Sequence, residues 1–367
     1  MKIGIMTMHR VQNVGSVLQA YALQHKIQQF GYDAELIDYV FPQEKKKSFS
    51  PKGILSWGWE VLNGFPSKRK KEKLDLFRKQ FLKCSVQTYC TREDLRTFPP
   101  EYDIYCTGSD QVWNPRHIGL DTSFMLDFAP SDARCIAYAS SFASKDIEEP
   151  FFSLYAKQLS KYKHITVREQ SGVEIIRRMT GKEASVTCDP TILLSADDWQ
   201  YIADASDLQM PKRYILVYLL RYMFDPRPGF YNIVEKVRTS LGLPVFYFNP
   251  YTNDGLQPHI KHLRGMGPTD FVCLVKNASF VITDSFHGTA FATIFNKPMI
   301  GVVKNANAGD GRILTLRKRV NGLQSVVGCN DNFCFGSDNL RRYQCEKEAV
   351  DSFRRDSENV LHNMILS

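Results

Sequence analysis

The sequence predicts an α/β protein of two Rossmann-like domains that face each other across a cleft. Short apolar runs, typical of buried strands, alternate with amphipathic segments along the chain, and this alternation indicates parallel sheets with helices on both faces. The length of 367 residues is sufficient for two domains, each with its own core. Because ligands of such sheets bind at the carboxyl ends of the strands, the residues after each predicted strand are the candidate site residues.

The composition of the chain limits the classes of molecule that we expect it to bind. Hydrophobic content of 43% and charged content of 23% are typical of a globular protein. The balance of 47 Lys+Arg against 39 Asp+Glu, a net charge of +8, favours anionic substrates or an anionic membrane surface. The excess is diffuse and no nucleic-acid-binding motif occurs, so we expect no nucleic acid. Nine scattered cysteines without a Cys-x-x-Cys pair, and no signal peptide or membrane span, indicate a cytoplasmic protein.

The N-terminal domain is predicted to occupy residues 1–195. It opens with a strand at 3–6, a helix at 16–30 that stops at Gly31, and a strand at 34–39. Asp38 ends that strand, as a ribose-binding acid does in dinucleotide folds, but the first loop lacks a GxGxxG motif. We therefore expect no nicotinamide or flavin cofactor. The further elements are strands at 102–107, 134–140 and 164–167 and helices at 151–161 and 170–179.

A basic insertion, residues 42–83, interrupts this domain. It contains Lys45-Lys46-Lys47, then Trp57 and Trp59, then Lys68-Arg69-Lys70-Lys71 and the amphipathic stretch LDLFRKQFL. One interpretation is a solvated insertion whose aromatic residues pack on their own domain. The other is a surface that touches an anionic membrane or a lipid-linked substrate.

The C-terminal domain is predicted to occupy residues 196–345, after a domain exit at Asp189-Pro190-Thr191. Its expected elements are strands at 214–220 and 245–248, helices at 229–241 and 268–277, and a strand–turn–helix junction at 279–300. Residues 346–367 are expected to form a final helix that packs back across the domains.

The junction at 279–300, SFVITDSFHGTAFATIFNKPMI, is the most informative stretch of the chain. It predicts a buried strand that ends at Thr283-Asp284-Ser285, followed at once by a helix capped by Ser285 or Asp284. Gly288 leaves the first turn of this helix open. Such a helix aims free backbone N–H groups at whatever lies above the sheet, so the junction is a predicted anion site.

His287 stands in the first turn of that helix, where an imidazole can reach a bound anion and transfer a proton. The alternative is a buried histidine that is merely hydrogen-bonded. Lys304 and Arg312 follow the next strand, and we expect them on the same side as His287. Each of these two cations is either a ligand contact or a surface charge.

Two other strand ends carry candidate groups. In the first loop, Asn13 precedes Gly15 and Ser16, which are small enough for the backbone to approach a ligand. Arg168, at the end of the strand at 164–167, can fork two hydrogen bonds onto a carboxylate or phosphate. Alternatively, Arg168 pairs with a neighbouring acid such as Glu169 and only holds the loop in place.

The strand at 102–107 leads into a polar cluster with one indole. Asp110, Gln111 and Asn114 are suited to hydrogen-bonding hydroxyls, and Trp113 is suited to stacking on a sugar ring. The alternative is a capped turn with Trp113 buried.

Together these motifs resemble the polysaccharide pyruvyl transferase family. The resemblance covers roughly residues 1–320, in the segments NVGSVLQAYALQ, YDIYCTGSDQVWNP, CIAYASSF, HITVREQSG, TCDPTILL and NASFVITDSFHGTAFATIFNKPMI. It implies a fold like that of GT-B glycosyltransferases. It also implies transfer of pyruvate from phosphoenolpyruvate (PEP) onto two hydroxyls of a sugar, giving a ketal and phosphate. No obligatory metal is implied, and no cofactor beyond PEP as co-substrate.

The resemblance also implies roles for single residues. His287 matches the family's general acid, and Arg168 matches an arginine that binds the donor. Many members carry an arginine two positions before the histidine, where this chain has Ser285, so Lys304 or Arg312 is expected to replace that cation. We assign PEP binding to Arg168, Ser285, Gly288, Lys304 and Arg312, and binding of the sugar acceptor to Asn13, Ser16, Asp110, Gln111, Trp113 and Asn114.

Two other functions fit the same residues. One is a GT-B glycosyltransferase that uses a nucleotide sugar, and the other is a non-catalytic glycan-binding protein of polysaccharide synthesis.

For a pyruvyl transferase, the expected partners are PEP and a sugar or lipid-linked oligosaccharide acceptor. The expected place is the cytoplasm, at the inner face of the membrane if residues 42–83 touch it.

Overall fold

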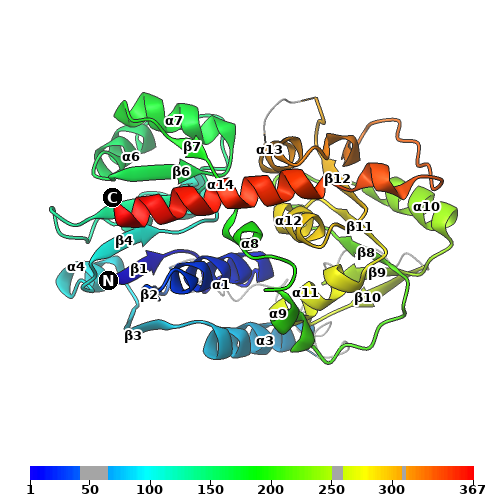
Figure 1. Cartoon of the computed structure of the whole chain (residues 1–367), viewed down its shortest axis with the longest axis horizontal. Helices are drawn as coiled ribbons and strands as arrows, with labels where there is room; N and C mark the ends of the chain where they lie inside the picture. Colours follow the sequence, from blue (N-terminus) through cyan, green and yellow to red (C-terminus); the bar gives the residue numbers. More distant parts are fainter. Residues whose placement is uncertain (42–64, 250–258, 308–310) are drawn as a thin grey trace, which may run out of the picture.

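The computed structural model describes residues 1–41, 65–249, 259–307 and 311–367. It contains two β-sheets with helices packed around them (Figure 1). The first sheet has seven strands in the order β3-β2-β1-β4-β5-β6-β7, and the second has six in the order β10-β9-β8-β11-β12-β13. Neighbouring strands in both sheets are parallel. The predicted α/β class is therefore confirmed.

The first sheet is built from the N-terminal half of the chain. Its strands are β1 (Lys2–Met6), β2 (Asp33–Tyr39), β3 (Cys84–Tyr89), β4 (Ile104–Thr107), β5 (Cys135–Ser140), β6 (His164–Val167) and β7 (Ser185–Val186). The helices of this half are α1 (Val14–Gln29), α3 (Pro66–Phe81), α4 (Arg92–Thr97), α5 (Pro115–Ile118), α6 (Phe151–Leu159), α7 (Gln170–Thr180) and α8 (Pro190–Leu193). The next helix, α9 (Gln200–Asp204), packs on α11 (Pro268–Asn277) of the second half. The strand β3 escaped sequence-based prediction because it lies at the sheet edge, where only Tyr89 is buried, and so lacks an apolar run.

The second sheet follows the same plan. Its strands are β8 (Ile215–Tyr218), β9 (Val245–Phe248), β10 (Ile260–Leu263), β11 (Phe280–Thr283), β12 (Met299–Val303) and β13 (Val326–Gly328). The helices are α10 (Gly229–Leu241), α11 (Pro268–Asn277), α12 (Phe286–Ile294), α13 (Arg312–Arg319) and α14 (Lys347–Leu366). Strands such as β5 and β11 are buried at every position, because helices cover both faces of each sheet.

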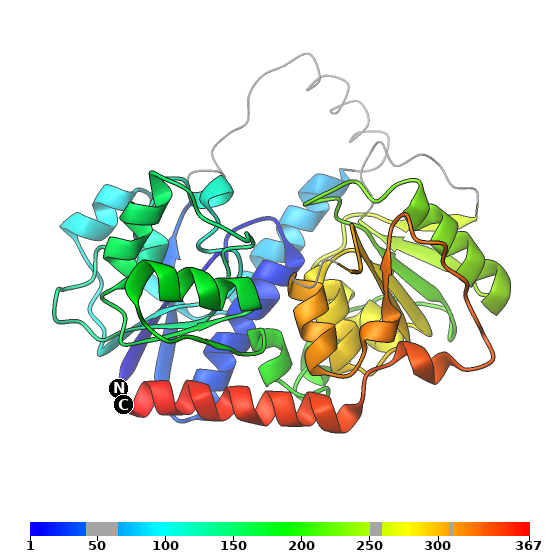
Figure 2. The same ribbon diagram turned by 90° about the horizontal axis from the view of Figure 1, so that it is seen from above.

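The two sheets share part of one hydrophobic core. The helix α1 lies between them (Figure 2) and is buried along most of its length. One apolar cluster contains residues of both sheets, for example Ile3 of β1 and Val281 of β11. This packing holds the carboxyl ends of the two sheets in a defined relation to each other.

The final helix α14 runs along both halves of the molecule (Figure 2). Near its start, Glu346 accepts a hydrogen bond from Asn321 Nδ2 (2.6 Å). Near its end, the carbonyl oxygens of Met364 and Ile365 accept hydrogen bonds from Arg134 Nη2 at 2.9 and 2.6 Å. The helix thus ties the second half of the chain to the first sheet.

Residues 42–64 of the predicted basic insertion lie outside the described residues, and with them Trp57 and Trp59. The described remainder forms α3, which buries Leu74 and Phe77 and sets the ring of Phe77 6.0 Å from that of Tyr21. The amphipathic stretch therefore packs on its own chain, and membrane contact through this segment stays a prediction. Within the described residues, no helix combines the length and the apolar character that crossing a membrane requires.

Candidate active site

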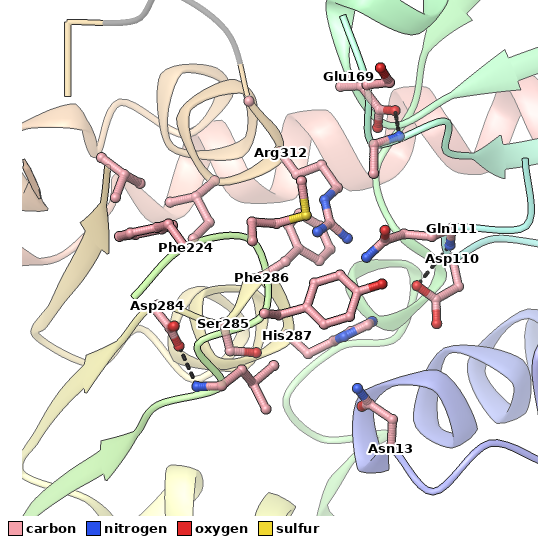
Figure 3. Close-up of a pocket in the computed structure, with 18 of the residues that line it drawn as sticks. Asn13, Asp110, Gln111, Glu169, Phe224, Asp284, Ser285, Phe286, His287 and Arg312 are labelled. Carbon is pink, nitrogen blue, oxygen red and sulfur yellow. Dashed lines mark hydrogen bonds between the residues drawn. The ribbon is translucent and has the colours of Figure 1, made fainter. Parts of the chain in front are cut away.

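A cavity of about 640 Å³ lies between the two sheets, where loops after strands of both sheets meet (Figure 3). Eight of the residues proposed from the sequence line it: Asn13, Ser16, Asp110, Gln111, Ser285, His287, Lys304 and Arg312. Four proposed residues do not: Arg168, Gly288, Trp113 and Asn114. The cavity therefore draws its lining from motifs that are far apart in the sequence.

His287 occupies the first turn of α12, directly after β11. Ser285 caps this helix, since its Oγ accepts a hydrogen bond from the Gly288 N–H (3.3 Å). The imidazole is buried, and its Nε2 has no hydrogen-bond partner among the described residues. Its nearest carboxylate oxygen, Asp189 Oδ2, is 3.9 Å away, beyond hydrogen-bond distance. A histidine with an unsatisfied nitrogen beside a cavity is not the merely hydrogen-bonded histidine of the alternative interpretation.

Burial also sets the protonation of this histidine. Loss of solvent lowers the pKa of His287 from its ordinary 6.5, and the carboxylates of Asp189 and Asp110 oppose that shift. The unliganded site therefore favours the neutral imidazole at pH 7. A bound anion would raise the pKa again, because negative charge stabilises the imidazolium.

Gly15 brings the N-terminus of α1 against His287. A β-carbon at position 15 would lie 2.1 Å from His287 Nδ1 and 2.3 Å from its Cγ. Asn13 caps α1 through its Oδ1, which accepts hydrogen bonds from the N–H groups of Gly15 (2.9 Å) and Ser16 (3.4 Å). The small residue predicted to admit a ligand thus admits the imidazole of the other half of the chain.

Replacing Gly15 with alanine is expected to lower activity at least tenfold while the protein stays folded. The added methyl group overlaps the ring of His287, so the imidazole or the start of α1 must move, and small displacements in an active site are costly. Turnover and thermal unfolding of Gly15→Ala, compared with those of Gly181→Ala, measure this. Gly181 has open space around its Cα but a left-handed φ of 69°, so that control alters stability only. Equal turnover in the two variants would contradict the expectation.

A cluster of buried charges lies beneath His287. The Arg168 guanidinium donates to Asp189 Oδ2 at 2.7 Å and to Asp110 Oδ1 at 3.4 Å. Asp110 also accepts a short hydrogen bond from Ser16 Oγ. Burial acts to raise the pKa of Asp110, but Arg168, His287 and Ser16 reverse this and lower it to about 2. Both carboxylates therefore remain ionised at neutral pH.

Arg168 does not line the cavity. Its side chain is 1% exposed, its guanidinium binds the two carboxylates, and it also stacks over the Phe286 ring at 4.8 Å. The two carboxylates neutralise its charge, although its Nε remains without a partner among the described residues. In this structure Arg168 supports the residues around His287, and a direct contact with PEP stays a prediction.

Arg312 differs from Arg168 because it lines the cavity and forms no ion pair within the described residues. It lies over the same Phe286 ring at 5.7 Å. With the amide of Gln111 turned to face it, the Gln111 oxygen accepts hydrogen bonds from both Nη atoms at 3.1 Å. Burial and the neighbouring Arg168 lower the pKa of Arg312 to about 10. Arg312 (Figure 3) and the exposed Lys304 together give the cavity a positive wall.

Three sequence-based assignments do not fit the positions observed. Trp113 is fully buried, with Nε1 donating to the Phe124 carbonyl (3.3 Å), and so cannot stack on a sugar. Asn114 caps α5 by accepting from the Arg116 N–H (3.0 Å). These two residues form the capped turn that was the alternative. The N–H of Gly288 is bonded to Ser285, and its missing β-carbon makes room for Thr283 Oγ1, so Gly288 serves the fold.

Asp284 does not cap α12. Its two carboxylate oxygens accept hydrogen bonds from the backbone N–H groups of Leu220 (2.6 Å) and Arg221 (2.8 Å). Burial raises the pKa of Asp284 to about 6. The residue therefore ties the loop after β8 to the junction that carries His287.

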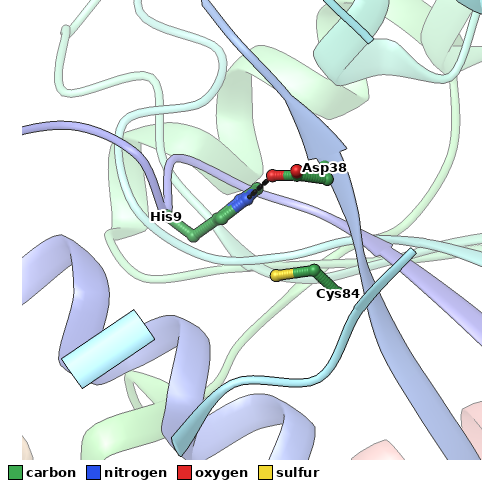
Figure 4. Close-up of side chains that lie close together, drawn as sticks. All are labelled: His9, Asp38 and Cys84. Carbon is green, nitrogen blue, oxygen red and sulfur yellow. Dashed lines mark hydrogen bonds and ion pairs between the residues drawn. The ribbon is translucent and has the colours of Figure 1, made fainter. Parts of the chain in front are cut away.

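A second polar cluster, His9, Asp38 and Cys84, lies at the end of β2 (Figure 4). These three side chains have the atoms of a possible metal site, but the Asp38 carboxylate is already bonded to His9 Nε2 (3.1 Å), to the Arg10 guanidinium (2.6 Å for each of two bonds) and to Thr88 Oγ1 (2.7 Å). The donors pull the pKa of Asp38 well below its ordinary value in spite of burial, which acts the other way. The cluster is best described as a buried ion pair.

Comparison with known proteins decides the family. The family model described as polysaccharide pyruvyl transferase matches residues 13–305, most of the chain. The chain belongs to the polysaccharide pyruvyl transferase family. No curated protein sequence gives a significant match to it.

Solved structures with a similar fold include sugar-nucleotide enzymes. UDP-GlcNAc 2-epimerase from Methanocaldococcus jannaschii matches over 100% of both chains, with a TM-score of 0.58 and 13% identity. The S. aureus MnaA–UDP structure covers 98% of this chain and 94% of its own, with a TM-score of 0.58 and 14% identity. UDP-GlcNAc 2-epimerase from Neisseria meningitidis covers 100% of both, with a TM-score of 0.57 and 10% identity. At such identity the likeness shows the fold alone, and it confirms the GT-B-like architecture.

Sequence reasoning did not assign two residues of this pyruvyl transferase family member, Asp189 and Glu169, to the site. Asp189 was interpreted only as a domain exit, although an Asp before Pro190 and Thr191 is a helix-cap signal, and it indeed caps α8. Glu169 lines the cavity, and its Oε1 accepts from Ser141 Oγ (2.8 Å) and from the N–H groups of Phe142 and Ala143 (both 3.1 Å). No sequence signal pointed to these loop contacts, because the donors lie 26 to 28 residues away.

Proposed function

We propose that the protein transfers pyruvate from PEP onto two hydroxyls of a sugar, forms a pyruvate ketal and releases phosphate. The observation that carries this proposal is that His287 and Arg312 line the same cavity. Arg312 is a half-buried cation that forms no ion pair with a carboxylate in the described chain. A desolvated cation that forms no ion pair with the protein is suited to an anionic ligand. The family assignment supplies the class of reaction.

Arg312 can also replace the arginine that many family members carry at the position of Ser285. Many members carry an arginine there, whereas here Ser285 is committed to capping α12. Arg312 reaches the same place from α13, since its guanidinium lies over the ring of Phe286, the next residue after Ser285. We infer that Arg312, with Lys304, binds the carboxylate and phosphate of PEP.

Each proton that moves in the proposed reaction has a donor and an acceptor. In the complex with PEP, protonated His287 gives its proton to the methylene carbon, and a first sugar hydroxyl bonds to the neighbouring carbon. The bond from that carbon to the phosphate oxygen then breaks, and a second hydroxyl bonds to the same carbon to close the ketal. Of the two hydroxyl protons, one returns to the imidazole and the other leaves with the phosphate. Placing the groups correctly and holding the developing charge supply most of the catalysis.

Replacing Arg312 with alanine is expected to weaken PEP binding about tenfold to a hundredfold, because charge-assisted hydrogen bonds contribute about 1.5–3 kcal/mol. Arg312→Lys should retain part of the affinity, since the charge stays but the fork is lost. The measurement is the rise in unfolding temperature with PEP, inorganic phosphate and nucleotide sugars, because a ligand stabilises only the state that binds it. The matched control is Arg178→Ala, an exposed arginine paired with Asp146 outside the cavity.

The same titration separates the candidate functions. A shift with PEP in the wild type that is lost in Arg312→Ala supports the proposal. A shift with a nucleotide sugar and none with PEP would replace it with the glycosyltransferase alternative. Binding of a glycan without any phosphate release from PEP would leave the non-catalytic alternative.

A further inference from the structure

Two adjacent exposed side chains form one wall of the cavity. Tyr222 is 48% exposed and Met223 is 50% exposed, and both line the cavity. Phe224 lines it with them (Figure 3). Among the described residues, no other exposed large hydrophobic side chain lines this cavity. Apolar surface left open at the wall of a cavity marks a binding surface.

The loop that carries these side chains is held in place. Asp284 accepts hydrogen bonds from the N–H groups of Leu220 and Arg221, the two residues before Tyr222. Asp284 also stands three residues before His287, so the same short segment positions the imidazole and the loop. The position of Tyr222 relative to the proposed proton donor is therefore held by hydrogen bonds to the Asp284 carboxylate.

The other half of the chain supports one face of the Tyr222 ring. The imidazole of His117, on α5, stacks on that ring with the two centroids 5.4 Å apart and an interplanar angle of 24°. Tyr222 remains about half exposed in spite of this contact. One face of the ring is thus covered and pre-oriented, while ring surface remains available to a ligand in the cavity.

The walls of the cavity differ in chemistry. His287, Arg312 and Lys304 form the cationic wall, which suits the carboxylate and phosphate of PEP. The wall of Tyr222, Met223 and Phe224 offers no charge to an anion. What it suits is a flat ligand with an apolar face and polar edges, and a sugar ring has C–H groups on one face and hydroxyls at its edge. The buried Trp113 cannot provide such a surface.

We propose that Tyr222 is the stacking platform for the ring of the acceptor sugar, with His117 supporting its opposite face. The proposal rests on the proposed function, because it names where the acceptor of that reaction binds. It places the two substrates side by side, with PEP on the cationic wall and the sugar on the wall of the loop after β8.

The test uses methyl glycosides of galactose, mannose, glucose and glucosamine as probes, and measures their binding by thermal shift with and without PEP. Tyr222→Ala is expected to weaken binding of the best glycoside about tenfold and to leave the shift with PEP unchanged. Tyr222→Phe keeps the ring and should bind like the wild type. Tyr201→Ala, which removes a 71% exposed tyrosine outside the cavity, is the matched control. His117→Ala leaves the platform ring in place and should have a smaller effect than Tyr222→Ala.

Three results would overturn the platform. They are unchanged glycoside binding in Tyr222→Ala, an equal loss in His117→Ala and Tyr222→Ala, and the absence of binding of every glycoside to the wild type. The equal loss would mean that the pair only bridges the two halves of the chain. If glycosides bind through Tyr222 but PEP neither binds nor releases phosphate, the platform stands and the pyruvyl transferase proposal fails. If PEP reacts normally in Tyr222→Ala and glycoside binding is intact, the platform alone fails.

Discussion

Replacing His287 with alanine is expected to lower the rate of pyruvyl transfer by roughly 10²- to 10⁴-fold, the usual contribution of a positioned proton donor. The imidazole lines the cavity and its Nε2 is unsatisfied among the described residues, so its removal breaks no protein hydrogen bond of that atom. The protein should therefore fold, and Arg312 and Lys304 should still give a thermal shift with PEP. The measurement is phosphate release from PEP in the presence of the sugar acceptor, together with the unfolding temperature.

The control for this change is His164→Ala. His164 starts β6, at the end of the first sheet away from the cavity, so its loss should leave the rate unchanged. A folded His287→Ala protein that transfers pyruvate at a near-normal rate would show that the methylene carbon receives its proton from elsewhere.

The pH dependence gives a second readout of the same residue. Only the imidazolium can protonate the methylene carbon, and burial lowers the pKa of His287 below 6.5 in the free enzyme. Since kcat/KM reports the free enzyme, kcat/KM for PEP should fall as pH rises above a midpoint under 6.5. In the proposed mechanism the midpoint for kcat should lie higher, because the negative charge of bound PEP would raise the pKa of the imidazole. In His287→Ala this decline should disappear from the residual activity.

Replacing Asp189 with alanine is expected to lower the free energy of unfolding by about 3–5 kcal/mol, the effect of breaking a buried ion pair from one side. Its side chain is fully buried and pairs with Arg168 at 2.7 Å, and its Oδ1 also binds the N–H (3.0 Å) and hydroxyl (2.7 Å) of Thr191. The change leaves Arg168 buried with only the longer contact to Asp110. Urea unfolding at constant m-value measures the loss.

The matched control is Asp146→Ala, which removes one partner of an exposed pair with Arg178 (2.8 Å) and should leave stability nearly unchanged. Asp189→Asn keeps the cap of α8 but removes the charge. Its free energy of unfolding should therefore lie between those of Asp189→Ala and Asp146→Ala. If Asp189→Ala proved as stable as Asp146→Ala, the buried cluster would not support the fold.

Because folding lowers the pKa of Asp110 and Asp189 below 3.8, the contribution of these two carboxylates to the free energy of unfolding should be complete above pH 3.8. It should fall as the medium is acidified toward pH 2.

Much of the site was predictable because its signals are local. The apolar run of β11, the abrupt polar turn and the following helical spacing lie within one stretch of sequence, so they placed His287 and Ser285 correctly in a helix start. The direction of a side chain after a strand is not local in this way. Trp113 and Gln111 are two residues apart, yet one is buried against Phe142 and the other lines the cavity.

The sequence by itself determined the alternation of strands and helices, the family, and the loops that meet at the carboxyl ends of the strands. Each of these follows from apolar periodicity and from short motifs. Only the tertiary structure decided which charges are neutralised. Arg168 and Arg312 look alike in the sequence, but Arg168 forms ion pairs with two carboxylates, whereas Arg312 forms none within the described chain. The reason is physical: Coulomb attraction and desolvation depend on distances in space, and Asp189 and Asp110 reach Arg168 from loops 21 and 58 residues away.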